Sequence, residues 1–483
     1  MITFITGLVV LIIGGLLYGR FAERVIKPTD SETPAIAQQD GVDFVPMGKW
    51  KNSLIELLNI AGTGPILGPL QGILFGPIAF ITIPIGCVIG GAFHDFMTGM
   101  ISTRNKGSQL PELVRKFLGK HLFGLYLVFV SLALFLLAAV FIYTPGDLFV
   151  TQILKSDSSS SNPIVWLVYG GIFLYYLVAT LFPIDKIIGK IYPIFGAVLL
   201  LSAVGVFIGI FVKGYPLVEL WDAAGAGYPF KTNFIPVFFV TVACGICSGF
   251  HSTQATIVSR TIKNEHEGRM IFYNTMILEG FIAMIWAAAG MGVLQAGLTD
   301  VETLGTQATK VVGIVAKDML GGVGGIIAII GVIVLPITSG DTALRSIRMM
   351  VGDAIKIDQT KKKNALCLAL GIFAVVAAIL IWSKLNPAGF NTLWQYFAWA
   401  NEVIAVFSFA MIARYMKRNN MPYIMAVLPG AFYMFVITSY LLSAPIGFNL
   451  PWIVAYIGAG ALALIYSVEI MVRKTKTVNG GVS

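Results

Sequence analysis

The chain has 483 residues, of which 57% are hydrophobic and only 12% are charged, and its formal net charge is +9. A soluble protein carries about 25% charged residues. Most of this chain must therefore lie where charge is costly, in the hydrocarbon of a membrane. This composition excludes a soluble globular protein.

Apolar segments long enough to cross a bilayer, about 20 residues each, follow one another along the chain. The first, at 2–18, lacks a basic leader and a small-residue cleavage site, so we expect a retained span rather than a signal peptide. The uncharged stretch between Glu56 and Asp95 is too long for one helix, so it is predicted to form two spans that turn near 72–77. The expected spans are 2–19, 52–73, 77–101, 122–143, 164–182, 191–212, 234–258, 270–294, 320–340, 365–383, 390–413, 422–443 and 449–471, which gives an all-α polytopic protein with about thirteen transmembrane helices.

The basic residues test this layout. With the N-terminus outside and the C-terminus cytoplasmic, 27 of the 33 lysine and arginine residues fall in the expected cytoplasmic segments. Those segments are 20–53, 102–120, 183–190, 259–269, 344–364, 414–419 and the tail after 472. This asymmetry is what membrane proteins show. The positive charge therefore indicates the topology of a multi-pass plasma-membrane protein surrounded by lipid, and not a nucleic-acid partner.

Four connecting segments have recognisable character. Residues 107–120 are predicted to form an amphipathic helix on the cytoplasmic side, and residues 303–320 another on the outside. Residues 156–163 (SDSSSSNP) are expected to be a flexible outer loop. The tail at 474–483 is predicted to be disordered.

Two of the expected spans place glycine and proline where a membrane helix should be continuous. The segment 59–69 (NIAGTGPILGP) contains four glycine or proline residues within seven positions, and a helix cannot pass through it intact. The segment 243–260 combines two glycines with a dense group of polar residues. Backbone groups freed in a bilayer are tolerated where they face protein, water or ligand. Ordinary glycine-rich packing is the alternative to a binding site.

The positions of the two breaks favour a transporter built from inverted repeats. Paired broken spans in corresponding places of two halves indicate a binding site near the middle of the membrane. We expect a five-plus-five core at 52–413, with repeat one at 52–212 and repeat two at 234–413. The flanking parts are an N-terminal helix and cytoplasmic linker at 1–51, two extra helices at 414–473 and the tail.

At each break, one half-helix offers N–H groups to a carboxylate and the other offers carbonyls to a cation. Such a site suits a small carboxylate or a zwitterion. The candidate substrate-binding residues are Asn59, Gly62, Thr63, Gly64, Gly68, Ser248, His251, Ser252 and Gln254.

Ionisable residues at membrane depth are the candidates for ion coupling. They are His94, Asp95, Glu279, Asp341 and Glu402. For Glu279 and Glu402 the alternative is a structural role as buried, paired carboxyl groups. His94 and Asp95 are adjacent, so they are expected to point about 100° apart on their helix. Asp95 has a structural alternative in an ion pair with Arg104 or with an arginine of another span. Asp341 and Arg345, four positions apart, are expected to form an ion pair at the inner mouth.

Two further features have a functional and a plainer interpretation. Thr338 and Ser339 offer hydroxyl ligands for Na⁺, but they are also ordinary polar residues near a helix end. The pair Cys244 and Cys247 has CxxC spacing, although small apolar residues surround it, and packing is the favoured interpretation. No metal site or cofactor is predicted, and the coupling ion is H⁺ or Na⁺.

Several motifs of this sequence resemble the carbon starvation protein A (CstA) family, which includes peptide and pyruvate transporters. They are NIAGTGPILGP at 59–69, GGAFHDF at 90–96, STRNKG at 102–107, CSGFHSTQATIVSR at 247–260, DTALR at 341–345 and LWQYFAWANE at 393–402. The resemblance implies the inverted-repeat fold of the amino acid–polyamine–cation superfamily. The chain looks like a short form that lacks the extra C-terminal helices of longer members, and it has Asn401–Glu402 where the family leads us to expect Asn-Gln.

Together these features predict a secondary active transporter, a proton-coupled importer of peptides, amino acids or pyruvate that works by alternating access. Sodium coupling of the same substrates is the first alternative, and a channel, a uniporter or a membrane-embedded nutrient sensor are weaker ones. An enzyme is not expected, because the sequence lacks HExxH, GxSxG and clustered metal ligands.

Overall fold

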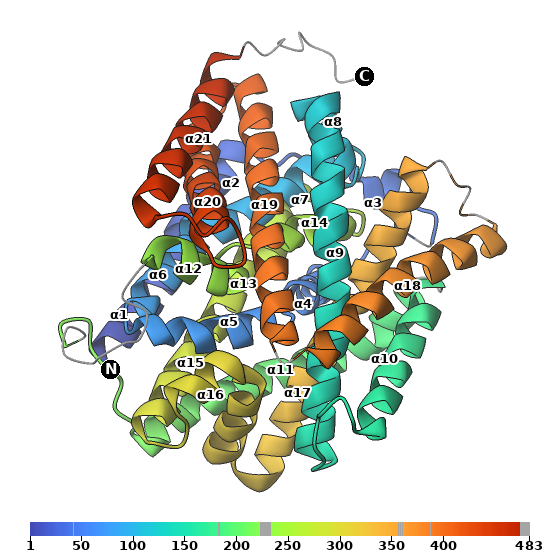
Figure 1. The fold of residues 1–483 in the computed structure, drawn as a ribbon. Helices are drawn as coiled ribbons and strands as arrows, with labels where there is room; N and C mark the ends of the chain where they lie inside the picture. Colours follow the sequence, from blue (N-terminus) through green and yellow to red (C-terminus); the bar gives the residue numbers. More distant parts are fainter. Residues whose placement is uncertain are drawn as a thin grey trace.

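The computed structural model describes residues 1–473 except 42, 182–183, 223–232, 356, 358, 360 and 387. These residues are almost wholly helical (Figure 1). Within the described ranges, eleven helices are long and apolar enough to cross a membrane, and one bent helix pair raises this to twelve. The prediction of an all-α, multi-pass membrane protein is confirmed. The count of thirteen stays a prediction, because the expected span at 234–258 is made of three short helices.

The helices extend a few residues beyond most of the predicted boundaries. Short π-helical turns at Val10–Gly14 and Cys87–Gly91 join α1 to α2 and α6 to α7. The bounds are α1 Ile2–Val9, α2 Gly15–Ile26, α3 Pro34–Ala37, α4 Lys49–Ile60, α5 Gly64–Gly72, α6 Ala79–Gly86, α7 Ala92–Arg104, α8 Leu110–Leu118, α9 Lys120–Leu148, α10 Pro163–Leu181, α11 Ile184–Lys213, α12 Phe234–Thr241, α13 Ala243–Ile246, α14 Gly249–Val258, α15 Asn274–Gln295, α16 Val301–Thr306, α17 Ala308–Ala354, α18 Lys362–Leu385, α19 Gly389–Arg418, α20 Ile424–Ser443 and α21 Trp452–Val472.

The first predicted break is present between α4 and α5. The helix α4 ends at Ile60, α5 begins at Gly64, and the two axes are bent by 52°. Pro65 stands in the first turn of α5, where its missing N–H costs no hydrogen bond. The glycine-rich sequence therefore breaks this span as expected.

The second predicted break is also present, between α13 and α14. Cys247 and Ser248 are both extended, with φ of −161° and −120°, so the helix stops for two residues before α14 begins at Gly249. A weaker interruption at Val242 separates α12 from α13. The span 234–258 is thus a chain of three helical pieces.

The two broken segments pack against each other in opposite directions. The helix α5 contacts α12 and α13, whereas α4 contacts α14. The first half of one segment therefore lies beside the last half of the other. The close approach requires glycine, because a Cβ atom on Gly68 would lie 2.7 Å from the carbonyl oxygen of Thr241.

The long helices α9 and α17 pack against each other and against α10, α11, α18 and α19, and so form a scaffold beside the broken segments. The element α17 consists of two helices that meet at Gly321, whose φ of 71° lies in the left-handed region that favours glycine. The prediction of one amphipathic helix at 303–320 is wrong in one respect. The segment is divided at Gln307 into α16 and the first part of α17.

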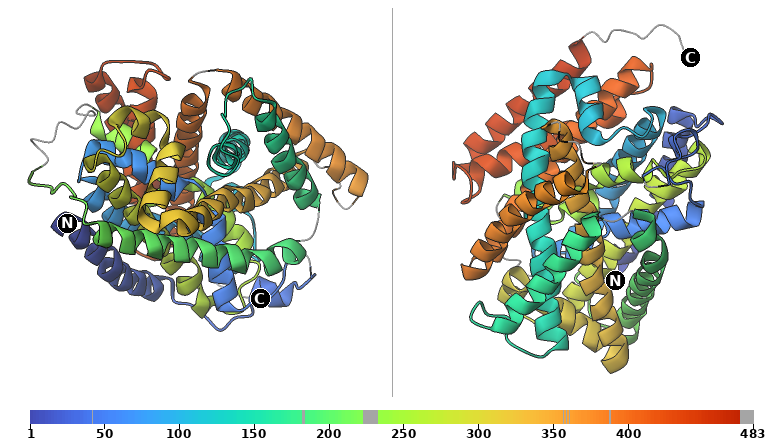
Figure 2. Two further views of the ribbon diagram at one scale, coloured as in Figure 1. Left: turned by 90° about the horizontal axis from the view of Figure 1, so that it is seen from below. Right: turned by 90° about the vertical axis from the view of Figure 1, so that its right-hand side faces the viewer.

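The two amphipathic connectors lie at opposite ends of the molecule. Figure 1 shows α8 at the upper end of the molecule and α16 toward the lower end, and the right-hand view of Figure 2 shows the same separation from the side. In α8 the apolar residues Leu110, Leu113, Val114 and Phe117 are buried, as their helical spacing predicts. The linker after α2 packs on the segment that follows α14, where Met47 pairs with Ile262. The expected tail at 474–483 lies outside the described residues.

Candidate functional site

A chain of four ionisable side chains lies buried beside the second break. One carboxylate oxygen of Asp95 is 2.8 Å from Nδ1 of His94, and the other is 3.1 Å from Nδ1 of His251. On its other side, Nε2 of His251 is 3.6 Å from a carboxylate oxygen of Glu279. The side chains are at most 1% exposed. These four side chains link α7, α14 and α15.

The structure corrects two expectations about Asp95. The adjacent side chains of His94 and Asp95 do not point apart, because the carboxylate turns back to the neighbouring imidazole. The alternative partner, Arg104, donates instead to Glu265, with its terminal nitrogen 2.8 Å from a carboxylate oxygen. Asp95 therefore belongs to the histidine chain and not to a structural pair with Arg104.

Glu56 is a member of this group that sequence reasoning missed. It lies on α4, which packs against both α14 and α15, and its side chain is fully buried. Among the described residues, neither of its carboxyl oxygens has a hydrogen-bond partner. The sequence does contain an indication of this role, because Glu56 is an ionisable residue inside the predicted span 52–73. In the sequence analysis it marks only the start of the uncharged stretch that ends at Asp95.

At the second break, Asn401 of α19 holds the start of α14. Its Oδ1 accepts from the backbone N–H of Phe250 at 2.7 Å, and its Nδ2 donates to Ser248 Oγ at 2.8 Å. One N–H group expected to be free for a substrate carboxylate is thus occupied. Ser252 pairs with Ser408 at 2.9 Å, and Gln254 donates to Thr253 at 3.1 Å.

At the first break, the predicted residues are all buried next to neighbouring helices. The amide oxygen of Asn59 accepts from Thr342 Oγ1 at 3.3 Å, and the Thr63 hydroxyl has no hydrogen-bond partner within the described ranges. A Cβ atom on Gly62 would meet the ring of Phe141, and one on Gly64 would meet Cys244. The two breaks therefore face each other across a close contact at Gly64.

The candidate Na⁺ ligands lie beside the first break. The Ser339 hydroxyl donates to the carbonyl oxygen of Leu58 at 2.9 Å, so α17 contacts the end of α4. Thr338 donates to the carbonyl of Leu335 at 2.8 Å. Asp341 accepts from Tyr175 at 3.1 Å, while its expected partner Arg345 donates to the carbonyl of Ala179 at 2.8 Å.

Glu402 stands apart from the histidine chain. Its carboxyl is fully buried on α19, and neither oxygen has a hydrogen-bond partner in the part of the chain that the structure describes. All four cysteines are free: Cys244 lies on α13 before the second break and Cys247 lies in the break, and they form no disulfide. Among the described residues, no three His, Cys, Asp or Glu side chains are arranged to hold a metal ion.

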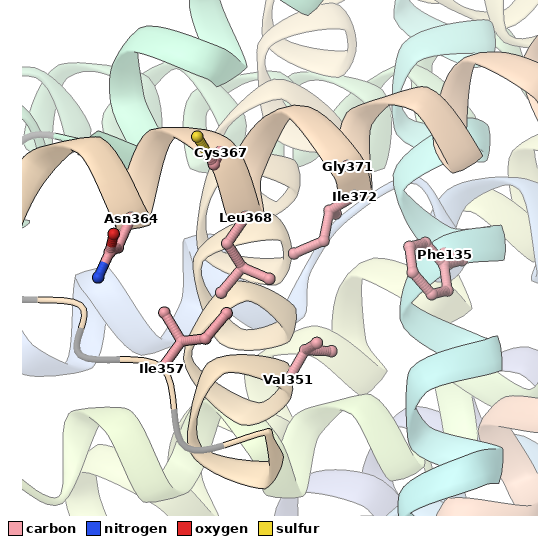
Figure 3. Close-up of a pocket in the computed structure, with 8 residues that line it drawn as sticks. All are labelled: Phe135, Val351, Ile357, Asn364, Cys367, Leu368, Gly371 and Ile372. Atoms are coloured by element: carbon pink, nitrogen blue, oxygen red, sulfur yellow. The ribbon is translucent and has the colours of Figure 1, made fainter.

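The cavities of the molecule differ in position and polarity. One of about 520 Å³ lies between α9, α17 and α18, and Figure 3 shows Phe135, Val351 and Leu368 among its lining residues. None of its lining residues belongs to the broken segments. Another, of about 150 Å³, lies between α5, α12 and α19 and is lined by residues that include Gln71, Thr241 and Trp394. The second cavity adjoins the broken segments, because Gln71 lies on α5 and Thr241 on α12.

A family model described as carbon starvation protein CstA matches residues 1–191 and 165–315 of the chain. The chain belongs to the CstA family. The resemblance stated from the motifs is thereby confirmed, and the motifs of the first break, of the His94–Asp95 segment and of the second break all lie within the matched residues.

Relatives of this CstA family member include named transporters. An uncharacterized membrane protein of Haemophilus influenzae is 40% identical over 60% of this chain and 91% of its own length. The peptide transporter CstA of Helicobacter pylori is 27% identical over 59% of this chain, and the pyruvate/proton symporter BtsT of Escherichia coli is 26% identical over 57%. The chain spans about half the length of these last two relatives, 50% and 46%.

Solved structures with the same fold are also membrane transporters. A manganese transporter of Eremococcus coleocola matches with a TM-score of 0.58, at 11% identity, over 89% of this chain and 99% of its own. At that identity the likeness shows the fold alone. The chain is thus a multi-pass membrane protein of the CstA family, and its named relatives and its structural neighbours are transporters.

Proposed function

We propose that this chain is a proton-coupled importer of small carboxylates or zwitterions, such as pyruvate, amino acids or short peptides. The observation that supports this proposal is the buried chain from His94 to Glu279, which is joined directly to the broken segment that carries α14. Charges are costly at this depth unless they are paired. A pairing that depends on protonation can therefore act on the position of α14.

The geometry of the histidines indicates where the proton would bind. A carboxylate oxygen can only accept, so Asp95 holds a proton on Nδ1 of both His94 and His251. The remaining nitrogen of His251, Nε2, faces Glu279. The pair His251 and Glu279 is thus the place where one more proton can be gained or lost without breaking the bonds to Asp95.

Coupling follows from the location of this pair. His251 lies on α14, one turn from Ser248 at the second break, while Glu279 lies on α15. Loss or gain of the proton changes the attraction between the two helices. Substrate contacts at the break and proton contacts at His251 would then both bias the same moving half-helix, as alternating access requires.

Sodium coupling is the second candidate, and it also has an observation in its favour. Oxygen atoms of Ser339, Leu58, Thr342 and Asn59 gather where α17 meets the end of α4. Hydroxyl and carbonyl oxygens of this kind suit a hard cation. A gradient experiment separates the two candidates.

The test is uptake of labelled pyruvate, alanine and alanyl-alanine into proteoliposomes under separately imposed proton and sodium gradients. We expect accumulation driven by an inward proton gradient and abolished by a protonophore. His251→Asn should lose accumulation but retain exchange of labelled for unlabelled substrate. His266→Asn, on an exposed histidine, is the matched control and should behave as the wild type. Accumulation driven by sodium alone would refute proton coupling.

A further inference from the structure

A buried ion pair that the proposed coupling does not use lies at the α16 end of the molecule. The ammonium of Lys384 on α18 is 2.8 Å from each carboxylate oxygen of Asp147 on α9. The Tyr169 hydroxyl donates to the same carboxylate, and the ammonium lies 4.5 Å from the ring centre of Tyr143. The pair was missed in the sequence because Lys384 was assigned to an outer loop and Asp147 lies beyond the predicted end of its span.

The Asp147 side of this pair opens on a large polar cavity. The cavity has a volume of about 880 Å³, and its lining includes Asp147, Tyr143, Asp157 and Lys310. The Asp147 side chain is 13% exposed, whereas that of Lys384 is only 3% exposed and lies behind it. A ligand in the cavity can therefore reach the carboxylate but not the buried ammonium.

We propose that this cavity is a docking site for zwitterions with a free amino group, short peptides above all, on their way to the broken helices. The ammonium of the ligand binds the Asp147 carboxylate from the side that faces the cavity, next to Ser158 of the adjoining loop. The ligand carboxylate binds Lys310 at the start of α17. The proposal rests on the proposed function, which it deepens by naming a substrate class.

Size and charge both favour a peptide over pyruvate. Ligand pockets range from about 300 to 1,000 Å³, and this cavity lies near the upper end of that range, which is more than a three-carbon acid fills. Pyruvate also has no ammonium group to interact with Asp147. Because acids and a lysine share the lining, the cavity matches a ligand that carries both charges.

The cavity lies next to the smaller cavity that adjoins the broken segments. Asn391 at the start of α19 lines both this cavity and the smaller one between α5, α12 and α19. The Gln71 side chain of α5 donates to the carbonyl of Gly305 in α16 at 2.9 Å, and both residues line the smaller cavity. The docking site therefore lies beside α5 and α16, on the side from which a ligand would approach the broken segments.

The test measures initial uptake rates of labelled alanyl-alanine, N-acetyl-alanyl-alanine and pyruvate by proteoliposomes over a range of concentrations. Asp147→Asn should raise KM for alanyl-alanine at least tenfold, with the maximal rate within twofold of wild type and KM for pyruvate unchanged. The acetylated peptide should already bind weakly to the wild type. Asp318→Asn removes an acid that pairs with Lys213 outside the cavity, and this control should leave all three substrates unaffected.

Because Asp147→Asn leaves a buried ammonium without its counter-charge, the double variant Asp147→Asn with Lys384→Met is measured as well. It should show the same selective rise in KM. An equal loss for all substrates, or a lower maximal rate with unchanged KM, would mean that the pair only holds α9 against α18 and would overturn the docking site. So would a wild type that accumulates pyruvate but no dipeptide, a result that leaves the proposed function standing.

Discussion

The buried carboxyl groups of this protein differ in what surrounds them, and that difference predicts how each responds to loss of its charge. Asp95 has two imidazole partners, whereas Glu402 has no hydrogen-bond partner among the described residues. An acid without partners in an apolar interior is stable only in its neutral form. Asp95, by contrast, is stabilised as an anion by the groups around it.

Asp95→Asn is therefore expected to destabilise the protein strongly. The amide presents only one oxygen, so one of the two histidines loses its acceptor inside the membrane. Removing one partner from a buried pair costs about 3–5 kcal/mol. Thermal unfolding of the purified protein in detergent should show a clearly lower midpoint, together with loss of proton-driven uptake.

Glu402→Gln is the comparison for this prediction. Glutamine has the shape of a neutral glutamic acid, and Glu402 has no described partner to lose, so a change below about 1 kcal/mol is expected. This variant also restores the Asn-Gln pair expected from the family. If Glu402→Gln unfolded as readily as Asp95→Asn, the distinction drawn between the two carboxyls would be wrong.

The buried ionisable residues around His251 could be predicted from the sequence, but the contacts between their side chains could not. His94, Asp95, His251 and Glu279 were all candidates because ionisable groups are rare at membrane depth. Their arrangement depends on how α7, α14 and α15 pack, and helical spacing within one segment does not determine that. The same limit hid Asp147 and Lys384, which are 237 positions apart in the chain.

At the scale of elements, the two breaks were predictable because glycine and proline act locally on the helix. Their close packing adds a testable constraint. Gly68→Ala should destabilise the contact between α5 and α12, since the new Cβ would lie 2.7 Å from a carbonyl oxygen that belongs to backbone. Overpacking costs typically about 1–3 kcal/mol, so the unfolding midpoint should fall.

The matched control for this prediction is Gly90→Ala. Its Cβ would meet Cys247 at 3.9 Å and Tyr433 at 4.0 Å, which is ordinary contact distance. This variant should unfold as the wild type does. Equal midpoints for the two variants would show that α5 and α12 are not held as closely as the structure places them.

The helix α16 begins with a cap that depends on pH. Asp300 Oδ1 accepts from the backbone N–H of Thr303 at 2.7 Å, and this bond, with one from the Thr303 side chain, holds the pKa of Asp300 below its ordinary value. A lowered pKa in the folded state means that the cap stabilises the helix above the ordinary aspartate pKa of about 3.9. The stabilisation is lost as the pH falls through the folded value.

Asp300→Ala should therefore loosen α16 at neutral pH and make little difference once the acid is protonated. Protection factors from hydrogen exchange of the amides in 301–306 measure this directly. Glu302→Ala changes a side chain of the same helix but keeps the backbone N–H groups that face Asp300, and it is expected to leave protection at neutral pH closer to wild type. A pH-independent difference between Asp300→Ala and wild type would contradict the capping role.

The boundary of α16 itself was not predictable from periodicity. The amphipathic pattern at 303–320 runs on without interruption, so the sequence favoured one helix, whereas the structure divides it at Gln307 and turns again at Gly321. The division is favoured by tertiary contacts, since Gln71 of α5 bonds to Gly305. Such contacts leave no mark in the local pattern of apolar residues.

At the scale of the whole molecule, the arrangement of the two broken segments agrees with inverted repeats. The segments run in opposite directions and pack half against half. The connectors α8 and α16 lie at opposite ends (Figure 1). Each feature is what a two-fold axis in the membrane plane would produce. The repeat boundaries at 52–212 and 234–413 remain predictions.

The orientation of the molecule in the membrane is predicted from the 27 basic residues that share one side. Single cysteines test it. Ser161 and Glu112 are both exposed, but they lie in the loop after α9 and on α8, toward opposite ends of the molecule. Each is changed to cysteine in a Cys367→Ala background, because the other three native cysteines are buried or half-buried.

A membrane-impermeant maleimide should label Ser161→Cys in intact cells and Glu112→Cys only after permeabilisation. We expect this outcome because short loops rich in lysine and arginine stay on the cytoplasmic side of the membrane. The reverse pattern would place the N-terminus inside and turn the docking cavity of Asp147 toward the cytoplasm. The cavity would then act in substrate release rather than capture, so this labelling result also decides how the Asp147 experiment is read.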